Sequence, residues 1–215
     1  MEPNHRIEPF QTYAISFYND EIDTTVTSDC DTVERWINEI PRPNLFIVGV
    51  DIKYRYDDLK DFVSTVQLCV GSRCLIYQLE FVDYDFPDVL LDFLANEEYS
   101  FVGWDIDYSL TRLETETALD IPRALVVDLM NLAGYRSLNN MDMLEYIFFD
   151  DPDCIELAEM VLEKELEDMP EEVLMLRWDL RQLTSEQVKY ACVDAFVAFE
   201  MGRFLNARQY RLTGL

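Results

Sequence analysis

The chain has 215 residues, 49% of them hydrophobic, and a formal net charge of −26 at pH 7. A chain of this length can bury one sizeable core, so we expect a single domain over residues 1–215. The charge opposes nucleic-acid binding, because that affinity comes mainly from lysine and arginine, and the sequence has 17 of these against 43 acidic residues.

Histidine and cysteine usage narrows the possible chemistry. His5 is the single histidine of the sequence, which removes histidine-activated nucleophiles and histidine-rich metal sites. The cysteines are odd in number and have no CxxC spacing, so neither a disulfide framework nor a zinc site is expected. They are Cys30, Cys69, Cys74, Cys154 and Cys192. Any catalysis must therefore use carboxylates, tyrosine or lysine.

The sequence also predicts where the protein is found. The N-terminus, MEPNHRIEPF, has no basic and apolar regions of a signal peptide, and no apolar run reaches the roughly 20 residues that span a bilayer. We therefore expect an intracellular protein of the nucleus or cytoplasm, without a membrane partner.

The first third of the chain favours extended structure. Asp51 follows a continuous apolar run that is typical of a strand buried on both faces, so we expect that strand to end at Asp51. Ser28 and Asp29 are candidate N-caps for one intervening helix. We expect two hairpins, one of strands Tyr13–Phe17 and Ile22–Thr27 across the turn Tyr18-Asn19-Asp20, and one of strands Val63–Val70 and Cys74–Leu79 across Gly71-Ser72. The strand Leu45–Val50 lies between them in the chain.

Helices and short strands alternate in the remainder. We expect the acidic stretch Met141–Met175 to be largely helical and to present a solvated face rather than a docking surface. The predicted elements around it are a helix from Pro87, a strand Tyr99–Trp104, a helix from Asp105, a strand Ala124–Val127, and a helix from the capping box Thr184/Gln187 to about Arg208. This order indicates an α/β fold with a mixed sheet between helices. An RNase-H-like architecture fits it, and the order alone leaves other doubly wound folds open.

Tyr190 and Asp194 are candidate site residues. They lie four apart in the last predicted helix, so both side chains can point into one site with Asp51. A tyrosine and an aspartate at this spacing occur by chance in many amphipathic helices, so the pair by itself carries little weight.

Several longer stretches form a set of motifs in a fixed order. They are Phe46–Asp51, the hairpin Thr65–Ile76, Phe101–Gly103 followed by a helix ending Arg112-Leu113, and Arg177–Phe196. This set resembles the first motif, the intervening hairpin, the second motif and the third motif of the 3′-5′ exonuclease domain of Werner-syndrome-type proteins, closest to the plant branch. The resemblance runs from about Tyr13 to Asn206.

The resemblance implies an RNase-H-like exonuclease fold and a particular site. Such DEDDy enzymes bind two divalent ions, Mg²⁺ or Mn²⁺, through four carboxylates, and a tyrosine positions or deprotonates the attacking water. Position by position, Asp51 and Asp194 match two of the metal ligands and Tyr190 matches the catalytic tyrosine.

Two positions depart from the family pattern. Lys53 stands where a glutamate ligand is expected, and Ser109 stands where an aspartate is expected. Strand alternation places Lys53 on the same face as Asp51, so we expect its ammonium group to occupy the place of a metal ion. Asp105 and Asp107 are the candidate replacements for the missing carboxylate.

These departures lead to alternative functions. The first is a catalytically inactive or impaired exonuclease-like domain that binds no metal and acts as a protein-interaction or regulatory module, with an active relative or a basic protein as partner. The second is an active Mg²⁺- or Mn²⁺-dependent 3′-5′ exonuclease on DNA or RNA that uses a displaced carboxylate. A third, overlapping interpretation is that Asp51, Lys53 and Asp194 form a purely structural salt bridge.

Overall fold

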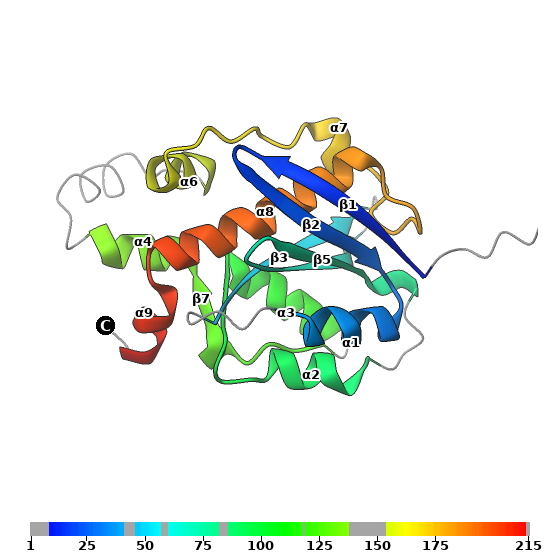
Figure 1. The fold of residues 1–215 in the computed structure, drawn as a ribbon, viewed down its shortest axis with the longest axis horizontal. Helices are drawn as coiled ribbons and strands as arrows, with labels where there is room; N and C mark the ends of the chain where they lie inside the picture. Colours follow the sequence, from blue (N-terminus) through cyan, green and yellow to red (C-terminus); the bar gives the residue numbers. More distant parts are fainter. Residues whose placement is uncertain are drawn as a thin grey trace, which may run out of the picture.

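A mixed sheet runs through the centre of the computed structural model (Figure 1). The structure describes residues 9–40, 46–56, 60–81, 86–117, 119–137 and 154–213. Within these, seven strands lie in the order β1-β2-β5-β4-β3-β6-β7. The bounds are β1 Phe10–Phe17, β2 Asp20–Thr27, β3 Ile47–Arg55, β4 Phe62–Val70, β5 Arg73–Gln78, β6 Ser100–Gly103 and β7 Val126–Asp128.

Two hairpins supply most of the antiparallel pairing. The strands β1 and β2 pair antiparallel, as do β4 with β3 and β5, whereas β2–β5, β3–β6 and β6–β7 are parallel. The first hairpin turns through Tyr18, whose φ is 53°, and the second through Gly71, whose φ is 61°. Both predicted hairpins are therefore confirmed.

Helices cover both faces of the sheet, so the molecule has three layers (Figure 1). On one face lie α1 (Cys30–Asn38), α2 (Asp88–Leu94) and α3 (Ile106–Glu116). On the other face lie α4 (Leu129–Ser137), α6 (Cys154–Leu162), α8 (Ser185–Phe204) and α9 (Ala207–Thr213). Neighbouring residues of β3 serve different cores, since Ile47 packs on the α8 side and Val48 on the α1 side. The expected α/β fold with a mixed sheet flanked by helices is confirmed.

Local sequence signals explain where several helices begin. Asp29 caps α1 by accepting a hydrogen bond from the Thr32 backbone. Thr184 caps α8, and Gln187 completes the predicted capping box. None of the helices in the described ranges has the length and apolar character required to cross a bilayer.

Most expected bounds differ from the structure by three residues or fewer, as for the strand expected at Ala124–Val127, which is β7 Val126–Asp128. Three expectations are wrong by more than this. The strand at Asp51 does not end there, because antiparallel pairing with β4 continues hydrogen bonding to Arg55. The last helix stops at Phe204 rather than near Arg208, since Asn206 has a left-handed φ of 56° and α9 starts after it.

The third concerns the acidic stretch, in which residues 163–170 are not helical. Glu163, with φ 55°, follows the end of α6, and Pro170 caps the short helix α7 (Glu171–Leu174). The part of the predicted helical stretch from 141 to 153 lies outside the described residues.

Candidate active site

Strand β3 sets the positions of Asp51 and Lys53. Val50 and Ile52 belong to the core beneath α1–α3, so alternation along the strand turns Asp51 and Lys53 toward α8. The Lys53 Nζ atom lies 3.0 Å from Asp51 Oδ2. The prediction that these two side chains share a face is confirmed.

Gly49 lets α8 come close enough to complete this site. A Cβ atom at Gly49 would lie 2.0 Å from the carbonyl oxygen of Ala195 and 2.6 Å from the backbone nitrogen of Phe199. Because a side chain of any size would meet helix backbone, glycine is needed where β3 and α8 cross. Asp194, the residue before Ala195, is thereby brought over the strand.

The three side chains form one ionic cluster. Lys53 Nζ donates to Asp194 Oδ2 at 2.5 Å and lies 3.0 Å from Asp51 Oδ2. The lysine side chain is 12% exposed, against 24% for Asp51 and 39% for Asp194. Asp51 Oδ2 is buried and is compensated by the lysine charge rather than by a well-aligned hydrogen bond. One ammonium group thus bridges two carboxylates.

This arrangement keeps Lys53 charged. Burial lowers the pKa of the lysine, but the negative charges of Asp194 and Asp51 outweigh burial and raise that pKa above its usual range. Burial raises the pKa of the Asp194 carboxyl group, and the lysine ammonium opposes that rise. The cluster therefore contains a permanent cation at neutral pH.

A cavity of about 310 Å³ lies over the cluster. Besides the three charged residues, Trp104 and α8 line it, and so does the non-helical segment 163–170 that leads from α6 to α7. We call this the covering segment. Its residues in the cavity wall are Leu166, Glu167, Asp168 and Met169. Carboxylates of an acidic stretch thus lie beside the cluster.

The covering segment is attached by polar contacts to the β1–β2 hairpin on one side and to helices α8 and α6 on the other. The Tyr18 hydroxyl donates to the carbonyl of Glu165 at 2.8 Å, and Lys164 pairs with Asp20 at 3.0 Å, which joins the segment to the β1–β2 hairpin. Further contacts join it to α8 and α6: Lys189 pairs with Glu167 at 3.1 Å, and Glu159 accepts from the Leu166 backbone at 2.7 Å.

Tyr190 lies in the wall of a neighbouring cavity and is not part of the ionic cluster. It is on α8, one turn before Asp194, and lines an adjoining cavity of about 340 Å³ together with Tyr18 and Glu165. Glu167 and Val193 line both cavities. The structure thus gathers Asp51, Lys53 and Asp194 and leaves Tyr190 next to them.

Ser109 lies on α3 beside Tyr54 of β3. It is half-buried. Burial raises the pKa of Tyr54, and the nearby Ser109 hydroxyl opposes that rise, although the Tyr54 hydroxyl has no hydrogen-bond partner of good geometry among the described residues. The serine therefore contributes a neutral hydroxyl to a tyrosine contact, in place of the carboxylate that the family pattern predicts.

The two candidate replacement carboxylates point elsewhere. The Asp107 side chain is 73% exposed and lies 3.6 Å from Arg123 Nε. Asp105 is exposed, with a left-handed φ of 40°, at the N-cap of α3. Neither is among the residues that line the cavity over the cluster.

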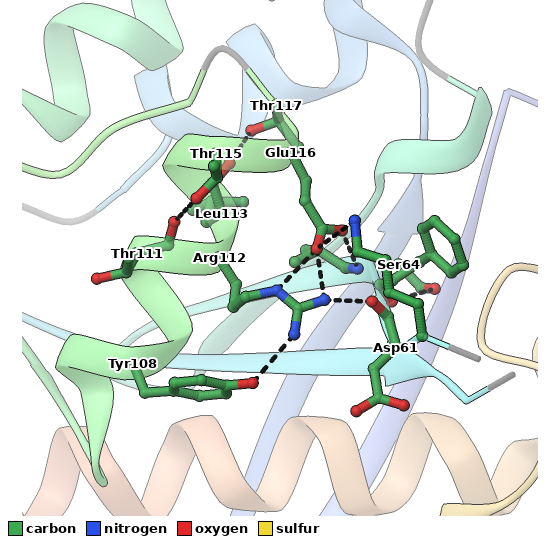
Figure 2. A network of polar contacts seen from close by, with 12 residues as sticks. Asp61, Ser64, Tyr108, Thr111, Arg112, Leu113, Thr115, Glu116 and Thr117 are labelled. Atoms are coloured by element: carbon green, nitrogen blue, oxygen red, sulfur yellow. Dashed lines mark hydrogen bonds and ion pairs between the residues drawn. The ribbon is translucent and has the colours of Figure 1, made fainter. Parts of the chain in front are cut away.

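Arg112 holds α3 against the end of β4 (Figure 2). Its guanidinium group bonds Glu116 one turn later, the carbonyl of Asp61, and, at 3.0 Å, the hydroxyl of Tyr108. Glu116 accepts in turn from the Val63 backbone at 2.9 Å. Ser109 lies on the same helix as Arg112, so these contacts also fix the position of Ser109 relative to the sheet.

The covering segment is the part of the site that sequence reasoning missed. The available signal was the presence of the apolar Leu166 and Met169 among acidic residues, since both side chains pack against the core on the α8 side. A face that is entirely exposed to solvent would not need these two apolar side chains. No cluster of three or more histidine, cysteine, aspartate or glutamate side chains suited to a metal occurs within the described ranges.

Solved structures share this fold. The exonuclease domain of Nibbler from Aedes aegypti matches with a TM-score of 0.66 at 13% identity, over 95% of this chain and 93% of that one. The NrnC protein of Brucella melitensis matches with a TM-score of 0.58 at 16% identity, over 79% of this chain and 76% of that one. NrnC was solved both bound to pGG and with bound Mg²⁺. Neither family models nor curated proteins gave a match.

The chain therefore has the fold of exonuclease domains of the RNase-H-like class. At these identities the likeness establishes the architecture and does not assign a reaction to this chain. The site itself differs from a carboxylate metal centre in one definite respect, because a lysine lies between its two acidic side chains.

Proposed function

We propose that this chain is a catalytically inactive or impaired relative of the 3′-5′ exonucleases, retained as a protein-interaction or regulatory module. The single observation that carries the proposal is the Lys53 ammonium, 3.0 Å from Asp51 and 2.5 Å from Asp194. The Werner-type resemblance of the motifs supports the ancestry, and the substitutions at positions 53 and 109 support the loss of activity.

The residues present do not fit a two-metal centre. Two divalent ions need several anionic oxygens, whereas Asp51, Asp194 and Lys53 together carry a net charge of −1. A divalent ion at this place would have to displace the ammonium group or lie beside it, and both arrangements are electrostatically unfavourable in a half-buried site. Ser109 adds no charge, so the second ion would lack an anionic ligand.

A rival proposal is an active nuclease that borrows a carboxylate from the covering segment. Glu167 and Asp168 line the same cavity as Asp51 and Asp194, which favours this route over Asp105 and Asp107. Against it, Glu167 is already paired with Lys189. A protein with a net charge of −26 also repels nucleic acid, whether DNA or RNA.

Calorimetric titration of Mg²⁺ and Mn²⁺ tests the proposal. We would compare the wild type with the Lys53→Glu, Ser109→Asp double variant, and follow each with trimming of labelled single-stranded DNA. Asp107→Asn is the matched control, because it changes an exposed carboxylate away from the cluster. We expect neither metal binding nor trimming in the wild type, and site-specific metal binding in the double variant. Metal-dependent trimming by the wild type would overturn the proposal.

The retained role is then one of binding proteins. The acidic surface repels polyanions and attracts basic proteins, so a basic partner or an active relative with a basic surface is favoured.

A further inference from the structure

Strand β1 has an open outer edge. It is the outermost strand of the sheet on its side, and among the described residues only β2 pairs with it. The pairing runs without a bulge from Phe10 to Phe17. Those backbone groups of β1 that do not bond to β2 therefore face outward along an edge of eight residues.

The register identifies which backbone groups point outward. Phe17 and Asp20 close a two-residue turn, so they form a hydrogen-bonded pair, and the pairs then alternate along the hairpin. Ser16, Ala14 and Thr12 fall at the non-hydrogen-bonded pairs, which directs their N–H and C=O groups away from β2. These three residues are also exposed.

Within β1 itself, the edge lacks the sequence devices that commonly prevent pairing. Natural edge strands carry charged side chains, proline or bulges to block a further strand. The sequence of β1, FQTYAISF, contains no charged residue, proline or glycine. A long, uncharged edge of this kind is a template for an added strand.

Cavities flank this edge on both faces of the sheet. One of about 440 Å³ lies between the hairpin and α1, where Thr12, Ala14 and Trp36 line it. The other is the cavity of about 340 Å³ on the α8 side, lined by Phe17 and Tyr190. Successive side chains of an added strand point to opposite faces, so alternate residues would face the two cavities.

We propose that the outer edge of β1 binds an extended, positively charged segment of another protein by strand addition. The inference rests on the proposed role as an interaction module and names its binding surface. Backbone pairing at Thr12, Ala14 and Ser16 supplies register, and the two cavities select side chains at alternate positions. Tyr190, which the ionic cluster does not use, becomes part of the α8-side pocket.

Charge favours this occupant over a second copy of the chain. Each copy carries a net charge of −26, so two copies repel, whereas a segment rich in lysine and arginine is attracted. The residues of the segment that pair directly with β1 need no particular charge, because β1 has no charged residue. Basic residues on either side of the pairing segment supply the attraction.

Selection from a displayed library of random 12-residue peptides tests the proposal. The bait is the full chain, and the Ala14→Pro variant serves for counter-selection. Proline removes one outward N–H group and places its ring where the added strand would lie, yet it leaves the bonds between β1 and β2 intact. Ala14→Val is the matched control, because it keeps the N–H group.

We expect enriched peptides to carry net positive charge. We also expect their side-chain preferences to alternate from one position to the next, because alternate side chains would face the two cavities. In fluorescence anisotropy, Ala14→Pro should weaken their binding at least tenfold, and Ala14→Val should change it less than threefold. Methylating the alternate peptide nitrogens that face β1 should abolish binding, whereas methylating the other set should not. This second measurement uses the unaltered protein, so it stands even if Ala14→Pro fails to fold.

Other results would overturn the proposal. These are a library with no peptide enriched above the support alone, enriched peptides that bind Ala14→Pro as tightly as the wild type, or peptides without net positive charge. A dimer in sedimentation velocity that Ala14→Pro abolishes would instead assign the edge to a second copy. None of these results depends on metal titration, so the strand-addition proposal and the proposed loss of catalysis can fail separately.

Discussion

Lys53 Nζ lies 2.5 Å from the carboxylate of Asp194, a residue 141 positions later in the chain. The contact joins β3 to α8 next to the place where Gly49 lets the two elements come closest. Lys53 therefore compensates the charges of two carboxylates. Its contact with Asp194 also links β3 and α8, which both line the cavity over the cluster.

Replacing Lys53 by methionine should destabilise the fold. The change leaves Asp51 and Asp194 as uncompensated neighbours. We expect a loss of about 2 kcal/mol at pH 7, less than the roughly 3–5 kcal/mol for breaking a fully buried pair, because Asp194 is 39% exposed. The loss should shrink toward pH 4, because the Asp194 carboxyl group, whose pKa is raised by burial, then takes up a proton. Urea unfolding measures it. Lys189→Met, which breaks an exposed pair, should cost no more than about 0.5 kcal/mol; equal losses would refute the role of the cluster.

Lys53 should resist amine-reactive reagents. The side chain is 12% exposed, and its pKa is raised by two carboxylates once the opposing effect of burial is overcome, so little neutral amine forms at pH 8 to 9. Lys60, whose side chain is 55% exposed, should react at least about tenfold faster. Mass spectrometry of acetylated peptides reads both rates. Comparable rates would mean that the cluster opens frequently.

Asp179 should stabilise the protein at neutral pH and lose this effect in acid. Hydrogen bonds from Arg177, together with one from Arg55, outweigh burial and lower the pKa of Asp179 to about 2. Because the folded pKa lies below the unfolded value of about 3.9, the stabilisation is complete above pH 4 and is lost as pH falls toward 2. Asp179→Asn should therefore cost about 2 kcal/mol at pH 7 and much less near pH 2.

Urea unfolding between pH 2 and pH 7 checks the Asp179 prediction. Asp92→Asn is the control, since Asp92 is exposed on α2. Parallel pH profiles for the wild type and Asp179→Asn would contradict the prediction, because they would mean that the ionised Asp179 carboxylate contributes no pH-dependent stability.

Two glycines should respond differently to alanine. Gly49→Ala places a Cβ 2.0 Å from helix backbone, so we expect a loss of at least about 3 kcal/mol and a weaker near-ultraviolet signal from displaced aromatic rings. Gly71→Ala meets no atom within 4 Å but keeps a φ of 61°, so it should cost only about 1 kcal/mol. Thermal unfolding ranks the two. A Gly49→Ala variant as stable as Gly71→Ala would contradict the close approach.

Much of the architecture followed from local sequence signals. Apolar runs and turn residues located both hairpins and the buried strand around Val48, and the Thr184 capping box located the start of α8. These signals depend on periodicity and on backbone groups close in sequence, so they can be read without a partner. Strand alternation likewise predicted that Lys53 shares a face with Asp51.

The length of β3 and the path of the acidic stretch were not accessible in this way. The strand extends past Asp51 because β4 pairs with it, and pairing is a property of two segments. Residues 163–170 leave the helical state because contacts with Tyr18, Asp20 and Lys189 compensate the loss of helical hydrogen bonds.

The sequence by itself determined the three-layer class of the fold and the pairing of a lysine with Asp51, since both depend on the period of side chains along one element. The sequence also offered Asp194 as a partner of Lys53, but only the tertiary structure gave the 2.5 Å distance between them, showed that Tyr190 lines an adjoining cavity, and placed β1 at the edge of the sheet among the described strands. Distances between elements depend on how closely they pack, and packing is fixed by side chains far apart in the chain, such as Gly49 against Ala195.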